Sequence, residues 1–198
     1  MSVFAPIIEG IKGVKDVNGE IQTKPFLDVC GHVLPVTDKF GAAFTLVKSD
    51  IGGNISRLTT KYDQNPAAYQ LLYPIVTEEV KAGTATGGKS DSQGLLWLNR
   101  AMEFIVALFR NLEQHKDWTT TQAANEAYNV TLKPYHGWMA QTAFTTAMRF
   151  IPNRDSFFAN LGSGDLTGDI DQFIGDFSPL LAENHEFLKK NGLADLKA

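Results

Sequence analysis

Apolar residues recur along this chain at the three- and four-residue spacing of amphipathic helices, and no convincing run alternates apolar with polar residues. The pattern predicts helices over residues 3–15, 25–34, 65–81, 92–115, 119–150 and 169–191. It also predicts a long helix that follows a turn at Thr37 and reaches Tyr62, and a short one between residues 153 and 164. The sequence therefore predicts an all-α fold of about eight helices.

Capping residues and prolines predict several helix ends. Thr23 and Ser92 are expected to cap the helices that follow them. Pro35 is expected to end one helix, because proline removes a backbone donor and clashes with the preceding turn. Pro134 is expected to kink the helix over residues 119–150 for the same reason.

Two further local signals concern a proline and a pair of glycines. Asn65 followed by Pro66 is expected to open the helix over residues 65–81. Gly52 and Gly53 stand in the middle of the helix that ends at Tyr62, where each glycine costs about 1 kcal/mol relative to alanine. We expect either an interruption of that helix or a close approach to its backbone.

Composition limits the class of protein. With 198 residues, 43% of them hydrophobic, the chain can build one full core, so we expect a single domain over residues 1–198. The net charge of −4 and the lack of a block of like charges make nucleic acid an unlikely partner. Cys30 is the only cysteine, which excludes an internal disulfide and favours a reducing compartment. No signal peptide and no membrane-spanning apolar run are apparent, so we expect a cytosolic protein.

Motifs of catalysis are absent from the sequence. The four histidines form no H-x-x-x-H or E-x-x-H pair, and no G-x-S-x-G, P-loop or G-x-G-x-x-G motif occurs. Cys30 and His32 are two residues apart on a predicted helix and therefore point to different faces. We expect a protein that is not an enzyme and that has no metal or cofactor.

Asp50, Asn54 and Arg57 are spaced so that all three side chains project from one helical face. A carboxylate, an amide and a guanidinium together offer acceptors and donors that suit a polyhydroxyl ligand such as a sugar. The alternative is a solvated surface stripe that contains an Asp–Arg pair.

Trp97, Ala101, Phe104 and Leu108 share one face of the helix over residues 92–115. Such a stripe packs a core by default. The functional alternative is that Trp97 stacks against the apolar face of a sugar ring, while Phe104 and Leu108 continue the same wall inward.

A third group lies at residues 135–138, where the sequence is YHGW. His136 could be a satisfied core histidine or could hold a polar atom of a buried ligand. Trp138 could be part of the core or an anchor at a membrane surface, where tryptophan is favoured.

These segments, in this order, resemble the glycolipid transfer protein family. Residues 50–55 (DIGGNI) match the family pattern D-x-x-G-N-I, and residues 97–100 (WLNR) are followed by Phe104. Residues 135–138 (YHGW), 25–27 (PFL), Asn65-Pro66, Pro152 and Phe157 also match, and the likeness spans residues 26–158. Each motif is weak alone, and together they are specific.

The resemblance implies a two-layer helical sandwich that carries one glycosphingolipid between membranes. It implies that Asp50 binds the sugar and the ceramide amide, Asn54 and Arg57 bind the sugar, Trp97 stacks on it, and His136 donates to the ceramide carbonyl. It further implies a tunnel for the lipid chains lined by Phe26, Phe40, Phe44, Phe104, Leu108, Leu132, Phe144 and Phe157.

The same resemblance implies a transient membrane contact through Trp138 and Phe150, with a monomer as the working form. Two positions depart from the family. Arg57 replaces a usual lysine, and Leu196 falls near a tyrosine that touches the headgroup in some members.

The rival functions are transfer of a phosphosphingolipid such as ceramide-1-phosphate, sphingolipid sensing through a partner protein, and a helical domain without ligand. Ceramide-1-phosphate carriers place an arginine where Trp97 stands, so Trp97 favours a sugar, although Arg57 and Arg100 leave phosphate open.

Overall fold

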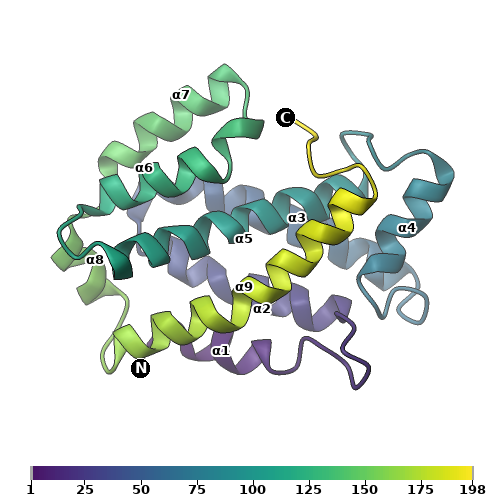
Figure 1. The fold of residues 1–198 in the computed structure, drawn as a ribbon, viewed down its shortest axis with the longest axis horizontal. Helices are drawn as coiled ribbons and strands as arrows, with labels where there is room; N and C mark the ends of the chain where they lie inside the picture. The colour runs from purple at the N-terminus through teal and green to yellow at the C-terminus, as the bar shows by residue number, and fades with distance from the viewer. Residues whose placement is uncertain (1, 198) are drawn as a thin grey trace.

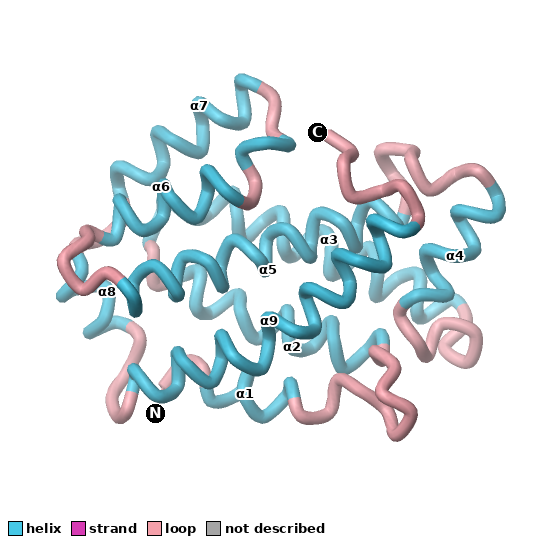
Figure 2. Tube along the Cα trace, in the orientation of Figure 1, coloured by secondary structure: helices cyan, strands magenta, loops and turns pink. Residues whose placement is uncertain are grey.

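The computed structural model describes residues 2–197, and their regular structure is helical (Figure 2). Three 3-10 turns, at Gly41–Phe44, Lys133–Tyr135 and Met148–Phe150, connect longer helices. The α-helices of the described chain are α1 (Ala5–Ile11), α2 (Thr23–Asp38), α3 (Thr45–Gln64), α4 (Tyr73–Ala82), α5 (Asp91–Gln114), α6 (Thr120–Val130), α7 (Trp138–Ala147), α8 (Arg154–Asn160) and α9 (Leu166–Lys190).

Helix α5 occupies the centre of the molecule because most of its circumference is apolar. It packs against α9, α3 and α6, and α2 packs against α3 and α1. In Figure 1, α6, α5 and α9 lie side by side in the nearer layer, with α2 and α3 behind them. This is the helical sandwich that the resemblance implied, with nine α-helices in the described residues rather than about eight.

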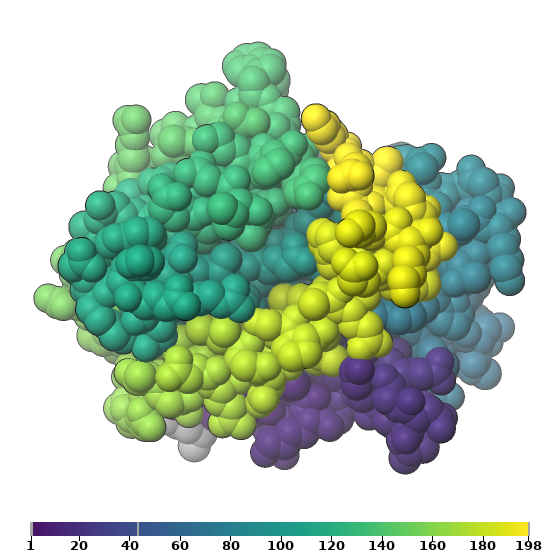
Figure 3. Space-filling view, viewed as in Figure 1, coloured from purple at the N-terminus to yellow at the C-terminus, as the bar shows by residue number. Residues whose placement is uncertain are grey.

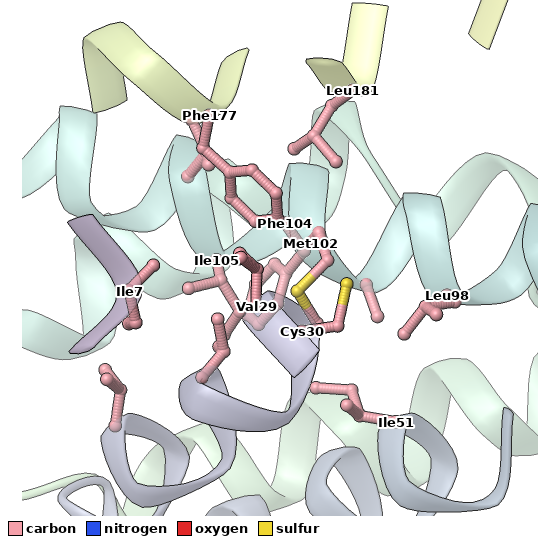
Figure 4. Close-up of a cluster of buried hydrophobic side chains, with 14 of the residues drawn as sticks. Ile7, Val29, Cys30, Ile51, Leu98, Met102, Phe104, Ile105, Phe177 and Leu181 are labelled. Atoms are coloured by element: carbon pink, nitrogen blue, oxygen red, sulfur yellow. The ribbon is translucent and has the colours of Figure 1, made fainter. Parts of the chain in front are cut away.

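The core lies between these layers. Cys30 of α2, Met102 and Phe104 of α5, and Phe177 of α9 are buried and meet in one cluster (Figure 4). Burial raises the pKa of the Cys30 thiol far above its ordinary value, so the thiol is uncharged and unreactive at neutral pH.

Two predicted helix starts were wrong by one turn or less. Thr23 is the first residue of α2 and not its cap, because its hydroxyl donates to the carbonyl of Tyr69, 2.5 Å away. Ser90, not Ser92, caps α5 by accepting from the backbone N–H of Gln93. Ser92 instead donates its hydroxyl to the carboxylate of Glu79.

The two prolines expected to shape helices act differently. Pro35 lies inside α2 rather than at its end. Pro35 is exposed, while buried Val33 and Val36 keep the helix packed against the core. Near Pro134 the predicted long helix ends at Val130 instead of kinking, and α7 begins at Trp138 after the chain reverses (Figure 1).

The Asn65–Pro66 pair forms a turn and does not open a helix. The Asn65 side chain accepts from the backbone N–H of Ala68 at 3.2 Å, and Leu72 donates its backbone N–H to Ile21. Those bonds hold residues 65–72 in turns, and α4 begins only at Tyr73.

Gly52 and Gly53 neither interrupt a helix nor admit a neighbouring part of the protein. Helix α3 is continuous from Thr45 to Gln64. No described protein atom lies within 4 Å of where a Cβ would stand at either glycine. The expected interruption was therefore wrong, and no other described part of the protein approaches the backbone at these glycines.

Candidate functional site

A pocket of about 350 Å³ opens between α3, α5 and α7. Asp50 from α3, Trp97 from α5 and His136 from the turn before α7 all line it, so three groups far apart in sequence meet at one pocket. The remaining wall is apolar and consists of Leu46, Val47, Ala101, Leu132, Ala140, Ala143 and Phe144. The site thus combines a few polar groups with an apolar interior, as is usual for small-molecule sites.

The aromatic wall of the pocket is held by specific contacts. The indole of Trp97 stacks on the imidazole of His136 with ring centres 5.5 Å apart. Its Nε1–H donates to Oε1 of Gln93 at 3.1 Å, one turn earlier on α5. These contacts fix the orientation of a half-buried indole whose surface contributes to the pocket.

His136 is coupled to the buried Tyr128. The Tyr128 hydroxyl and Nδ1 of His136 are 3.0 Å apart and hydrogen-bonded. Burial, together with the nearby positive charge of Arg100, lowers the pKa of His136 below its ordinary value of 6.5. The imidazole is therefore neutral at pH 7.

Asp50 stands at the mouth of the pocket. Its pKa is raised above the ordinary value of 3.8, chiefly because surrounding protein displaces water from the carboxylate. A hydrogen bond from Asn54 and the positive charge of Arg57 act in the opposite direction but do not cancel this effect. The Asp50 side chain is nevertheless exposed, so its carboxylate can accept hydrogen bonds from a ligand.

The raised pKa of Asp50 makes stability depend on pH. Above its ordinary pKa the unfolded chain has released the proton while the folded protein still binds it, so rising pH lowers the free energy of unfolding. Asp50→Asn removes this dependence. We expect the variant to melt at a higher temperature than the parent at pH 7, with the difference shrinking as pH falls toward 4 in thermal melts monitored by circular dichroism. Asp63→Asn, at an exposed position near the end of α3, is the control, and an equal gain there would contradict the assignment.

Asn54 and Arg57 share the helical face of Asp50 but do not line the pocket. Asn54 is buried and donates to the backbone carbonyl of Asp50 at 3.0 Å. Arg57 turns toward the start of α5, where it donates to the carbonyl of Ser90 at 3.1 Å. Its stem crosses Gly94, where a Cβ would come within 3.0 Å of Arg57 Cδ. The predicted trio is thus brought together, with only Asp50 facing the pocket.

The predicted tunnel residues form a connected series rather than an open channel. Leu132 and Phe144 line the pocket, and Phe44 and Phe144 border a small void of about 10 Å³ beyond it. From Phe144 the ring contacts run to Phe104 at 5.8 Å and to Phe44 at a further 5.8 Å.

The series continues into the core. Phe44 stacks on Phe40 with ring centres 4.2 Å apart, and Phe40 lies 4.3 Å from Phe157. Phe26 and Leu108 are buried in the same core. Six of the eight predicted residues, from Leu132 at the pocket to Phe157, thus lie along one apolar path, and all eight pack in or against the same core.

An apolar surface lies beside the pocket. Trp138 is 76% exposed and Phe150 is 72% exposed, with Met139 and Leu46 also exposed. A hollow of about 610 Å³ lies on this surface, bounded by α7 and by Ala42, Trp138, Met139 and Phe150. Clustered exposure of large apolar side chains marks an interaction surface.

Sequence reasoning missed several parts of the pocket. Ala140 and Ala143 line it with Phe144, and their helical spacing would have been informative had the start of α7 been known. Tyr128 and Arg100 support the wall through contacts that no local pattern reveals.

Residues 2–197 contain no cluster of three or more His, Cys, Asp or Glu side chains that could hold a metal ion. In the same part of the chain, no helix combines the length and apolar character needed to cross a bilayer.

A helical sandwich with a polar mouth over an apolar pocket and aromatic path defines a binding protein for an amphipathic molecule. Comparison with known proteins agrees with this class. A sequence profile described as Glycolipid transfer protein (GLTP) matches residues 21–163, and Glycolipid transfer protein 1 of Arabidopsis thaliana is 48% identical over all of this chain and 98% of its own. The chain belongs to the glycolipid transfer protein family.

Solved structures give the same fold. The GLTP-fold structure of FAPP2, reported as selecting simple glycosphingolipids, has a TM-score of 0.89 and 29% identity over the whole of both chains. A variant of Arabidopsis ACD11 complexed with ceramide-1-phosphate has a TM-score of 0.88 at 18% identity, over 98% of both chains. The second similarity shows the fold alone.

Proposed function

We propose that this protein binds one glycosphingolipid and carries it between membranes, with residues 1–198 acting as one domain. The observation that carries the proposal is the convergence of Asp50, Trp97 and His136 at one apolar pocket. The family membership supports the ligand class.

The mouth of the pocket suits a sugar linked to an amide. Trp97 offers an indole for stacking on a sugar ring, and Asp50 offers a carboxylate to hydroxyl and amide donors. In a neutral His136, Nδ1 accepts the hydrogen bond from the Tyr128 hydroxyl, so the ring proton lies on Nε2. The Nε2–H is then the donor to the ceramide carbonyl. Asn54 and Arg57 lie one and two turns from Asp50 on the same helical face, and contact with the sugar requires them to leave the backbone carbonyls that they bond here.

The apolar path supplies the place for the lipid chains. Transfer of each CH₂ out of water is worth about 0.8 kcal/mol, so a carrier without an apolar interior would leave its cargo in the membrane. Because the rings along the path contact one another in this structure, entry of the chains requires Phe144, Phe104 and Phe44 to separate.

Phosphate is a poorer fit than sugar at this mouth. The guanidinium of Arg57 donates to the carbonyl of Ser90, and that of Arg100 donates to the carbonyls of Ala194 and Leu196. Both arginines thus bond backbone carbonyls and neither lines the pocket. Trp97 does line the pocket, and its indole cannot form an ion pair with a phosphate. These contacts favour a glycolipid over ceramide-1-phosphate.

We further propose that Trp138, Phe150 and Met139 touch the membrane during loading, since they are exposed around the apolar hollow beside the pocket. Peripheral contact of this kind needs no spanning helix. We propose a monomeric, cytosolic carrier that catalyses no reaction and needs no cofactor.

Transfer between vesicles tests this function. Fluorescent galactosylceramide and fluorescent ceramide-1-phosphate in donor vesicles are mixed separately with acceptor vesicles and the protein. We expect rapid transfer of galactosylceramide and little transfer of ceramide-1-phosphate. Preferential transfer of ceramide-1-phosphate would establish the rival cargo, and binding without transfer would favour a sensor. Failure to bind either lipid would reject the proposal.

A further inference from the structure

Arg100 joins three separate parts of the chain behind the pocket. It is only 2% exposed and is not among the residues that line the pocket. Its guanidinium donates to the carbonyl of Leu196 at 2.8 Å and to that of Ala194 at 2.6 Å. The same group lies 3.4 Å from the centre of the Tyr135 ring and 4.7 Å from the ring of Trp97.

The segment that Arg100 binds follows α9. Residues 193–197 follow α9, and in Figure 1 they rise toward the connection between α6 and α7. In the space-filling view this segment covers the surface between α4 and the α6–α7 connection (Figure 3). Leu193 and Ala194 are buried, and Leu196 packs against the core, so the segment has apolar contacts of its own.

A buried guanidinium is a costly way to hold a helix to a terminal segment. Burial lowers the pKa of Arg100 because the charged form loses its hydration. Carbonyl oxygens and aromatic rings surround the guanidinium, and the nearby carboxylates of Glu103 and Asp195 also favour its charged form. An apolar side chain at this position would avoid that cost but could not bind both carbonyls while stacking on a ring.

The contacts of Arg100 reach two residues of the pocket wall. Trp97 lies one turn away on α5 and lines the pocket directly. Tyr135 immediately precedes His136, whose imidazole stacks on Trp97. A shift of the guanidinium would therefore remove its contacts with Trp97 and Tyr135, and both Trp97 and the turn before α7 could then move.

We propose that Arg100 is a positioning residue for sugar recognition, and that it uses the carbonyls of residues 194 and 196 as a brace to set Trp97 and the Tyr135–His136 turn. The inference rests on the proposed function, because it assigns to Trp97 the contact with the sugar. The C-terminal segment thereby determines headgroup selectivity without touching the lipid.

Arg100→Lys tests the brace while keeping the positive charge. Lysine cannot reproduce the planar fork that bonds two carbonyls and stacks on Tyr135. We expect affinity for galactosylceramide to fall about tenfold, because the sugar would then meet a Trp97 and a His136 turn that are no longer held in the binding geometry. Affinity for the same ceramide without its sugar should fall less, because ceramide depends on the His136 turn but not on stacking against Trp97.

Arg110→Lys is the matched control. Arg110 lies on the same helix and bonds Ser178 of α9, away from the pocket. Galactosylceramide affinity should be unaffected by this change. Equal loss of affinity for galactosylceramide and ceramide in Arg100→Lys would show a merely structural role, and no loss for either would also overturn the inference.

A chain that ends at Leu193 supplies an independent variant, because it lacks both acceptor carbonyls. We expect it to lose sugar selectivity to the same extent as Arg100→Lys, and the combined variant to lose no more than either alone. Additive losses would show that the two parts act separately and would overturn the brace. If the unmodified protein binds no galactosylceramide, the proposed function fails instead, so the two failures are distinguishable.

Discussion

Trp97→Ala is expected to reduce galactosylceramide transfer by roughly 30-fold, because truncating a tryptophan at a binding hot spot costs about 2 kcal/mol or more. Asp50→Val is expected to have an effect of similar size, since hydroxyl and amide donors lose a charged acceptor. Both residues line the pocket, and neither is part of the solid core. Transfer of the fluorescent lipid between vesicles measures the effect, with circular dichroism to verify the fold.

Trp118→Ala is the control for the loss of an indole. Trp118 follows the far end of α5 and stacks on His115 with ring centres 3.8 Å apart. Its replacement should leave transfer of the galactosylceramide unchanged. If Trp97→Ala and Asp50→Val both transferred at the parent rate, the assignment of the headgroup site would be wrong.

Ala140→Phe is expected to block uptake of the lipid from within the pocket. Ala140 is half-buried on α7 and faces the pocket, so a phenyl ring there occupies space that the lipid chains must cross. We expect affinity for galactosylceramide to fall about tenfold or more, while the melting temperature stays the same or rises because apolar surface is filled.

Thr145→Phe places the same ring on the exposed part of α7 and should leave affinity unchanged. Isothermal titration with a short-chain galactosylceramide gives the affinities of both variants. Unimpaired binding by Ala140→Phe would show that the lipid enters elsewhere.

The sequence predicted most of the helices because their apolar faces are long and regular. The helix that contains Trp97 and Phe104 was predicted within one residue at each end, since its stripe continues for six turns. The segment after Thr119 was predicted as one helix, but it is two helices joined by a turn. Local spacing stays helical on both sides of Pro134, and the turn is held instead by tertiary contacts such as those of the Gln141 side chain, which donates to the carbonyls of Lys133 and His136.

The candidate site shows the same division between local and distant information. Asp50, Trp97 and His136 were predicted to share a site because their motifs, in this order, resemble those of the glycolipid transfer protein family, and the structure places them around one pocket. The turn of Arg57 toward Ser90 could not be predicted, because it depends on Gly94 of another helix. Arg100 likewise bonds residues more than ninety positions away, which no periodicity encodes.

The packed rings between Phe144 and Phe157 have a consequence for how cargo length is selected. Beyond the pocket, the protein's own aromatic side chains fill the route that we propose for the alkyl chains. Each added stretch of hydrocarbon must then displace another ring from its neighbour. The preferred chain length is then set by the free energy needed to separate successive pairs of aromatic rings.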